Sequence, residues 1–187
     1  MSLYEIIGFV TSVLCVWLFA RENAGGFPVA AVASAFYCVV NYQAKLYSDA
    51  GLQIIYLFLS LYGWYQWRHG GQDQGVLRAG RLPRSSVPFL VLIGISFAAP
   101  LGYLLRTHTD ASLPYLDAAT TATSLIAQWM LARKYLENWL VWIAVDPIYA
   151  GMYVYRDLYL TAVLYLLLTL LAVQGYRQWR RAATVPA

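Results

Sequence analysis

Seven long apolar stretches follow one another along this chain, separated by short polar segments. Each has roughly the 17 to 25 residues that a helix needs to cross the hydrocarbon core of a bilayer. Backbone polar groups in lipid must be satisfied within the segment, which makes such spans helical. The pattern predicts an all-α polytopic membrane protein with seven transmembrane helices, at residues 4–20, 27–43, 50–67, 87–105, 115–132, 139–155 and 158–176.

Part of this pattern occurs twice. A shift of 112 positions aligns residues 11–68 with residues 123–180 without a gap, and both copies close with Gln-Trp-Arg. Duplicated hydrophobic units of this kind build transporters whose two halves move against each other. Other identities under the shift are Trp17/Trp129, Arg21/Arg133, Tyr37/Tyr149, Tyr47/Tyr159 and Gly63/Gly175.

Each copy holds three predicted helices, and one further helix separates the copies. The second copy therefore enters the membrane in the same direction as the first, which makes the copies parallel repeats related by an axis along the membrane normal. Sugar carriers of the SWEET type have this arrangement. We predict a first three-helix repeat, a cytoplasmic loop that acts as a solvated tether, a linker helix and a second repeat, at residues 1–68, 69–86, 87–105 and 115–180.

Composition agrees with a location in the lipid bilayer, because 60% of the 187 residues are hydrophobic and only 12% are charged. The positive-inside rule then sets the orientation. With the N-terminus outside and the C-terminus inside, the outer segments hold only Lys45, Arg106 and Arg156 of the basic residues. The net charge of +4 therefore belongs to the cytoplasmic rim and does not indicate nucleic-acid binding.

The sequence holds no group of residues that points to an enzyme or to a bound cofactor. Cys15 and Cys38 fall inside predicted helices, where thiols act as small packing residues. His69 and His108 lie in predicted loops without a metal-binding partner at useful spacing. The sequence also lacks a P-loop. We therefore expect no catalytic residue, no metal site, no cofactor and no ATP-driven transport.

One carboxylate lies near the middle of a predicted span. Asp146 is costly in lipid unless it faces a partner or a water-filled cavity, and Pro147 frees a backbone carbonyl beside it. Aromatic rings attract a flat cation by stacking and cation–π interaction, and an acid complements its charge. We predict that this helix face binds the solute; the alternative is that its rings only pack helices together. At spacings of three and four, the face comprises Trp139, Trp142, Asp146, Tyr149 and Tyr153.

The first repeat presents smaller side chains on the equivalent face, which leaves room for a ligand held asymmetrically between the halves. Tyr37 and Asn41 are candidate contacts there. Gln128 and Gln53 are further candidates, for which hydrogen bonding between helices is an equally good explanation. Trp64 is a weaker candidate, because an indole also suits the membrane interface. The equivalent face comprises Phe27, Ala30, Ser34, Tyr37 and Asn41.

Three segments carry recognisable motifs: residues 62–67 (Tyr-Gly-Trp-Tyr-Gln-Trp), residues 124–134, and residues 137–146, whose Trp-x-x-Trp pair is Trp139 and Trp142. With the layout of nearly the whole chain, they resemble the PnuC family of vitamin-precursor transporters. The resemblance implies seven core helices of SWEET-like topology. It also implies uptake of nicotinamide riboside by facilitated diffusion across a bacterial inner membrane, with trapping by a cytoplasmic kinase.

The resemblance leaves the identity of the solute open, because relatives of this family carry thiamine, riboflavin or deoxynucleosides instead. Where the family commonly has Trp-Pro-x-Gly, this chain has Phe27-Pro28-Val29-Ala30, on the face opposite the aromatic stripe. Thiamine is the first alternative solute, since its ring also carries a positive charge. Alternative functions are a proton-coupled carrier, a membrane receptor and a scaffold, and a homo-oligomer is compatible with the sequence.

Overall fold

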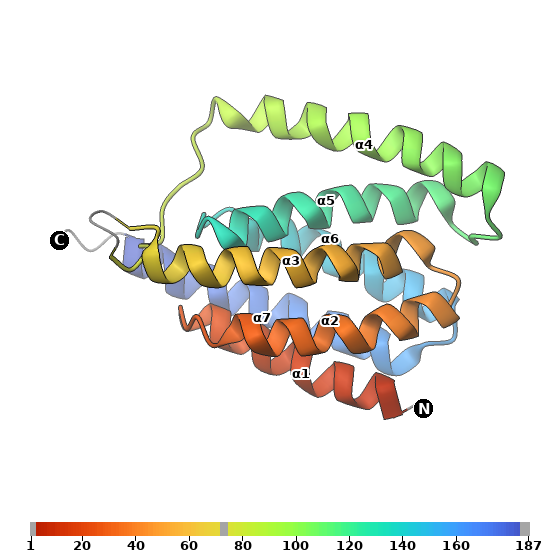
Figure 1. Ribbon diagram of the computed structural model, residues 1–187, viewed down its shortest axis with the longest axis horizontal. Helices are drawn as coiled ribbons and strands as arrows, with labels where there is room; N and C mark the ends of the chain where they lie inside the picture. Colours follow the sequence, from red (N-terminus) through yellow and green to blue (C-terminus); the bar gives the residue numbers. More distant parts are fainter. Residues whose placement is uncertain (1–2, 72–74, 184–187) are drawn as a thin grey trace.

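The computed structural model describes residues 3–71 and 75–183, and within them the chain forms seven α-helices (Figure 1). One helix corresponds to each predicted span, which confirms the all-helical architecture. Pro114 begins α5, a first-turn position that proline favours because its missing N–H is not needed there. The helices are α1 Leu3–Ala20, α2 Gly26–Gln43, α3 Tyr47–His69, α4 Ser86–His108, α5 Pro114–Ala132, α6 Asn138–Tyr155 and α7 Tyr159–Ala183.

Six of these helices form a closed ring. Around the ring, the packed neighbours are α1 and α2, α2 and α3, α3 and α5, α5 and α6, α6 and α7, and finally α7 and α1. The remaining helix, α4, packs against α5 and lies at the outer edge of the bundle in Figure 1. The ring therefore takes three helices from each copy of the duplicated sequence, and the helix between the copies stays outside it.

Backbone geometry repeats along with the sequence. α6 begins and ends 112 residues after α2. Within the described chain, four non-glycine residues have a positive φ, and they form two pairs at the same separation: Glu22 with Lys134 (56° and 59°), and Lys45 with Asp157 (59° and 58°). Each closes the helix before it in the left-handed conformation common at helix ends. The repeat thus extends to positions where the side chains of the two copies have opposite charges.

Two tryptophans make reciprocal hydrogen bonds between the copies at one end of the ring. Trp67 Nε1 donates to Leu131 O at 3.1 Å, and Trp179 Nε1 donates to Phe19 O at 3.1 Å. Each bond is the equivalent of the other under the shift of 112, and the two indole centres lie 5.6 Å apart. Such an exchange of equal contacts is typical of two units related by a two-fold axis.

The opposite end of the ring carries a second contact between equivalent residues. The Tyr153 hydroxyl donates to Asn41 Oδ1 at 2.6 Å, and these residues are 112 positions apart. A residue can touch its own equivalent only close to the axis that relates the two units. This contact and the Trp67–Trp179 pair therefore indicate a two-fold axis that passes through the middle of the six-helix ring, from one end of the bundle to the other.

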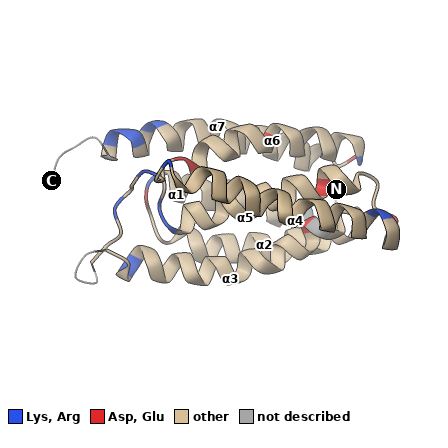
Figure 2. Ribbon diagram, turned by 90° about the horizontal axis from the view of Figure 1, so that it is seen from above, with Lys and Arg blue, Asp and Glu red and all other residues tan. Residues whose placement is uncertain are grey.

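Apolar side chains cover the outside of the bundle. α4 exposes large hydrophobic residues along its length, among them Phe89, Ile95 and Leu104. In residues 3–71 and 75–183, two helices, α4 and α7, are by length and composition apolar enough to cross a membrane on their own. Figure 2 shows Lys and Arg concentrated at the end of the bundle that holds the α3–α4 loop and the end of α7. This distribution matches the predicted charge asymmetry, while the orientation itself stays a prediction.

The loop between α3 and α4, which the sequence predicts to be a solvated tether, makes backbone hydrogen bonds to another loop. The Gly80 N–H donates to Lys134 O at 3.0 Å, and the Gly80 carbonyl accepts from the Leu136 N–H at 2.8 Å. Lys134 Nζ also donates to Leu77 O at 2.8 Å. The loop is therefore docked on the turn between α5 and α6. Sequence pattern alone does not reveal such backbone pairing between distant loops; residues 72–74 lie outside the described chain.

Candidate functional site

A cavity of about 120 Å³ lies inside the ring. All six ring helices contribute to its wall, and α4 does not. It lies between the two contacts of equivalent residues, Trp67 with Trp179 and Asn41 with Tyr153. The wall brings together most of the residues that the sequence predicts for binding: Trp139, Trp142, Asp146, Tyr149, Gln128, Gln53 and Tyr37.

The other predicted contacts lie elsewhere. Tyr153 and Asn41 bond to each other at one end of the ring and are not part of the cavity wall. Tyr153 shares the predicted face of α6 but lies beyond the end of the cavity, where its bond to Asn41 joins the two copies. Trp64 is 38% exposed, and the Arg68 guanidinium lies 5.0 Å from its ring centre. This outer position suits an interfacial anchor better than a contact with solute.

Close packing fixes the indole of Trp139 at the cavity wall. A Cβ atom at Gly175 on α7 would lie 2.7 Å from Trp139 Cε2. Any residue larger than glycine at this position would therefore clash with the indole. The equivalent ring of the first copy, Phe27, would lie 2.2 Å from a Cβ atom at Gly63. Trp139 also packs edge-on against Trp179, with ring centres 5.3 Å apart. A glycine at the same position of each copy therefore leaves room for one large aromatic side chain in each half.

Asp146 is buried, with 2% exposure, and its side chain lines the cavity. Its Oδ1 atom has no hydrogen-bond partner among the described residues. α6 continues through the following residue, Pro147, whose ring nitrogen cannot donate to the helix. An unpaired buried carboxylate oxygen is uncommon in a folded protein. Asp146 is therefore a group that a solute can engage.

A second carboxylate, Asp49 in the first turn of α3, lines the same cavity and is absent from the residues that the sequence predicts for binding. Asp49 is 1% exposed. Its Oδ1 accepts hydrogen bonds from the Tyr149 hydroxyl at 2.9 Å and from Thr121 Oγ1 at 3.3 Å. The Ser124 hydroxyl lies 3.1 Å from the same tyrosine oxygen. Side chains from α5 and α6 therefore hold this additional acid in place.

A sequence signal for Asp49 exists once the start of its helix is known. The third predicted span begins at residue 50, whereas α3 begins at Tyr47. Asp117, near the outer end of the fifth predicted span, is buried as well. Helix starts placed by hydropathy alone assign such acids to the membrane surface. Within α3, residues at spacings of four, three and four share one face and line the cavity: Asp49, Gln53, Tyr56 and Ser60.

The cavity wall combines two carboxylates with aromatic rings, and among its described residues there is no Lys, Arg or His. A flat cation can lie against the rings while the acids balance its charge. A phosphate group would find no cationic partner there. Across the part of the chain that the structure describes, no cluster of three or more His, Cys, Asp or Glu could hold a metal ion. The acids and rings of the wall are suited to holding an organic cation.

An ion pair joins the two copies at the basic end of the ring. Lys134 Nζ lies 2.8 Å from Glu22 Oε2, and the Lys134 side chain is only 3% exposed. The ammonium group also lies 4.7 Å from the centre of the Trp67 ring. Glu22 and Lys134 are equivalent positions, so this pair lies close to the axis as well.

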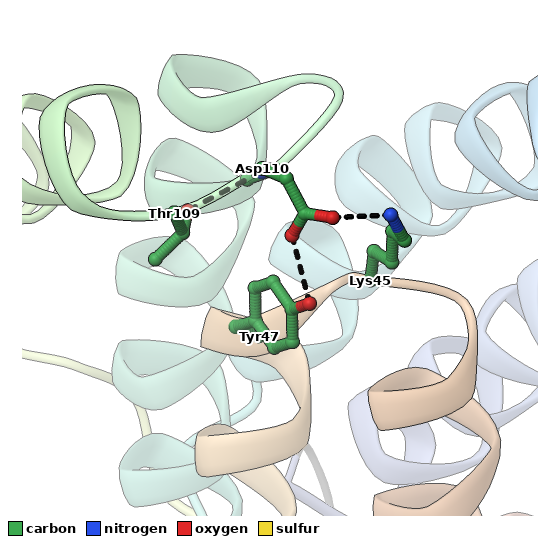
Figure 3. Close-up of polar contacts among 5 residues, drawn as sticks. Lys45, Tyr47, Thr109 and Asp110 are labelled. Carbon is green, nitrogen blue, oxygen red and sulfur yellow. Dashed lines mark hydrogen bonds and ion pairs between the residues drawn. The ribbon is translucent and has the colours of Figure 1, made fainter.

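At the other end of the bundle, the loop before α3 is tied to the loop between α4 and α5. Asp110 accepts hydrogen bonds from Lys45 and, at 2.8 Å, from the Tyr47 hydroxyl (Figure 3). The hydrogen bond from Lys45 is the largest cause that lowers the pKa of Asp110, and the bond from Tyr47 is the next. The hydrogen bond to Asp110 in turn raises the pKa of Lys45. Both charged side chains are more than half exposed, at 55% and 53%. Solvent therefore screens this tie, and it contributes little energy.

The sequence is similar to those of known transporters. Residues 2–181 match the family described as Nicotinamide mononucleotide transporter. The chain is 24% identical to the nicotinamide riboside transporter PnuC of Escherichia coli strain K12, over 98% of this chain and 87% of that one. It is 22% identical to the riboflavin/roseoflavin transporter RibM of Streptomyces davaonensis, over 94% of this chain and 83% of that one.

The fold is similar to that of a solved transporter. The crystal structure of the vitamin B3 transporter PnuC matches with a TM-score of 0.79 at 22% sequence identity, and the match covers 96% of this chain and 81% of that one. At this level of identity the likeness shows the fold alone. It covers the ring and the outer helix together, because nearly the whole chain is included.

Proposed function

The chain belongs to the nicotinamide mononucleotide transporter family, and we propose that it carries nicotinamide riboside, a small cationic vitamin precursor, into the cytoplasm by facilitated diffusion. Membership confirms the resemblance to the PnuC family. The family is one of transporters rather than enzymes. Its homologues imply a multi-pass protein of the bacterial inner membrane.

The observation that carries the proposal is the composition of the cavity wall. The indoles of Trp139 and Trp142 line the same space as Asp146, a buried acid with an oxygen that has no hydrogen-bond partner among the described residues. A pyridinium ring gains from stacking and cation–π attraction at such a wall, and its charge offsets that of the acid. Because the described wall has no cationic side chain, a nucleoside cation fits it better than a nucleotide phosphate. We therefore favour the riboside over the mononucleotide.

The duplicated ring supports transport by movement of two halves. A contact between equivalent residues closes each end: Trp67 with Trp179, and Asn41 with Tyr153. Rotation of one half against the other opens one contact while the second holds, which gives alternating access. These contacts support the SWEET-like arrangement of parallel repeats. The cavity of about 120 Å³ is smaller than the roughly 300 Å³ or more of typical ligand sites, so solute entry requires such a movement.

Facilitated diffusion alone does not concentrate a solute. We infer that a cytoplasmic kinase traps the riboside, because the added phosphate makes the product a poor fit for the acidic cavity. The concentration of Lys and Arg at one end of the bundle supports a cytoplasmic location for that end and for the C-terminus (Figure 2).

Thiamine is the second candidate solute. It also carries a ring cation, so the acids and rings of the wall suit it too. Ala30 lines the cavity where the equivalent residue of the second half is Trp142, within the segment that departs from the family's Trp-Pro-x-Gly pattern. A similar chain is named a riboflavin/roseoflavin transporter, so solutes differ among relatives of comparable similarity.

Calorimetric titration of the purified protein separates these solutes. We expect nicotinamide riboside to bind at least about tenfold more tightly than thiamine or nicotinamide mononucleotide. In proteoliposomes that contain this protein alone, labelled riboside should exchange by counterflow and equilibrate without accumulating. Accumulation driven by a proton gradient would reject facilitated diffusion, and an absence of counterflow would leave a receptor or a scaffold.

A further inference from the structure

Two buried carboxylates face the cavity, one from each half. Asp49 belongs to α3 and Asp146 to α6, and they are 1% and 2% exposed. They do not occupy equivalent positions, since Asp49 corresponds to Thr161 and Asp146 to Ser34 under the shift of 112. Duplication therefore does not explain the pair. Each half carries its acid at a position where the other half is uncharged.

Each acid keeps one oxygen free. Asp49 Oδ1 is occupied by Tyr149 and Thr121, whereas Asp49 Oδ2 has no partner among the described residues. Asp146 Oδ1 is unpartnered in the same sense. An ionised carboxylate can only accept hydrogen bonds, and buried polar atoms normally have a partner. No described side chain supplies the missing donors, and a solute that enters the cavity is the candidate source.

Among the described residues of the wall, no positive charge balances these acids. The titratable side chains around Asp49 are tyrosines and a further acid: Tyr56, Tyr149, Tyr153, Tyr165 and Asp117. A buried charge is stable only when it is paired or hydrogen-bonded. A solute that brings positive charge into the cavity is therefore favoured over a neutral solute of the same shape.

We propose that Asp49 is a second solute-binding carboxylate, which makes the cavity selective for organic cations that carry hydroxyl or amino donors apart from the charged ring. The inference rests on the proposed carrier function. In this arrangement Trp142 and Asp146 hold the charged ring of the solute, and Asp49 accepts hydrogen bonds from the donors at the other end of the solute. Tyr149 lies three residues after Asp146 on α6 and donates to Asp49, which fixes one acid relative to the other.

This arrangement links recognition to the movement of the halves. A solute that touches both acids bridges α3 of the first copy and α6 of the second. The competing interpretation is that Asp49 only ties α3 to its neighbours through Tyr149 and Thr121. A neutral side chain of the same shape preserves that tie, because an amide oxygen also accepts hydrogen bonds. Asp49→Asn therefore separates the two interpretations.

The probe pair is nicotinamide riboside and its neutral dihydro form, which differ in charge and little in shape. By calorimetry on the full chain, we expect the wild-type protein to prefer the cation by about 100-fold. Asp49→Asn should weaken binding of the cation by about tenfold and change binding of the neutral form by less than about threefold. Asp146→Asn should act in the same direction, and the double variant should lose the preference.

Asp110→Asn makes the same chemical change on the exposed surface and should leave the preference unaltered. An Asp49→Asn protein that is less stable but keeps the full preference would overturn the inference, while the carrier function would stand through Asp146. If Asp49→Asn does not fold, Asp49→Thr takes its place, since Thr161 occupies the equivalent buried position of the second half. Wild-type protein that binds neither probe would overturn both the inference and the proposed function.

Discussion

The two halves of the ring agree in their backbone and differ where they face the cavity. Helix ends, left-handed closing residues and the seats for large rings, Gly63 and Gly175, recur at a separation of 112. Some residues that line the cavity recur as well, as Tyr37 and Tyr149 do, but most of them differ between the halves. Shared positions thus hold most of the fold, and differing positions give the proposed solute site its asymmetry. The differing pairs are Ala30/Trp142, Ser34/Asp146, Asp49/Thr161 and Gln53/Tyr165.

The largest effect is expected where the halves differ most in side-chain size. Trp142→Ala gives the second half the residue that the first half carries at Ala30. Loss of ring stacking and cation–π attraction should weaken binding of nicotinamide riboside on the order of 100-fold, about 3 kcal/mol. Calorimetry measures this, and circular dichroism checks that the helices remain.

Trp64→Ala is the matched comparison for Trp142→Ala. The sequence places Trp64 among the weaker candidates, whereas its indole lies outside the ring beside Arg68. We expect a change in affinity of less than about twofold. Equal losses in the two variants would mean that the inner wall has no special part in binding, and would break the distinction between shared and differing positions.

A smaller effect, on stability, is expected where the halves agree. Alanine at Gly63 places a Cβ atom 2.2 Å from Phe27 Cε1, and alanine at Gly175 places one 2.7 Å from Trp139 Cε2. Overpacking of this kind costs about 2 kcal/mol. Both variants should therefore melt at a lower temperature, with Gly63→Ala the more affected because its contact is closer.

Gly151→Ala is the control for these two glycines. It lies in α6, and an added Cβ atom there has no neighbour within 4 Å. Because alanine favours a helix more than glycine does, this variant should melt at the same or a higher temperature. Wild-type melting of Gly63→Ala would show that the ring of Phe27 can move aside, and would remove the glycine seats from the shared architecture.

Sequence pattern predicts most of this fold, because hydropathy and the repeat act over whole helices. It also gathers Trp139, Trp142 and Asp146 on one face, since helical spacing alone decides that. It misses Asp49, because the polar first turn of α3 delays the apparent start of the helix. Sequence pattern also assigns Tyr153 to the binding face, because periodicity specifies one face of a helix and not how far along that helix the cavity extends.

Contacts close to the axis lie beyond sequence reasoning for a different reason. Nothing in a single copy shows which of its residues will meet their own equivalents, because that depends on how the two halves pack. Asn41 with Tyr153 and Glu22 with Lys134 are unlike residues at equivalent positions. The docking of Gly80 beside Tyr135 likewise depends on the position of a distant loop.

The reciprocal indole bonds allow a finer test of the agreement between halves. Trp67→Phe and Trp179→Phe each remove one hydrogen bond to a carbonyl, of Leu131 or Phe19, that still accepts from a backbone N–H. Each should cost about 1 kcal/mol in the free energy of unfolding. Similar decreases in melting temperature are expected, and the double variant should depart from additivity because the rings touch. A loss in only one variant would show that the halves are not energetically equivalent.

The smallest effect concerns the tie between the first half and the loop before α5. In the second half, Tyr159 donates to Asp157 of its own loop at 2.9 Å, whereas the equivalent of Asp157 is Lys45, so Tyr47 finds its acid in Asp110. Because the folded-state pKa of Asp110 is lowered, its contribution is present above about pH 4 and is lost as the pH falls through that lower value. Lys45, whose pKa is raised, contributes fully below about pH 10.4, and this contribution is lost as the pH rises through the higher pKa of the folded state. The difference in melting temperature between wild type and Asp110→Asn should therefore be small, level between these limits and vanishing in acid. A difference that grows in acid would show that the tie has another origin.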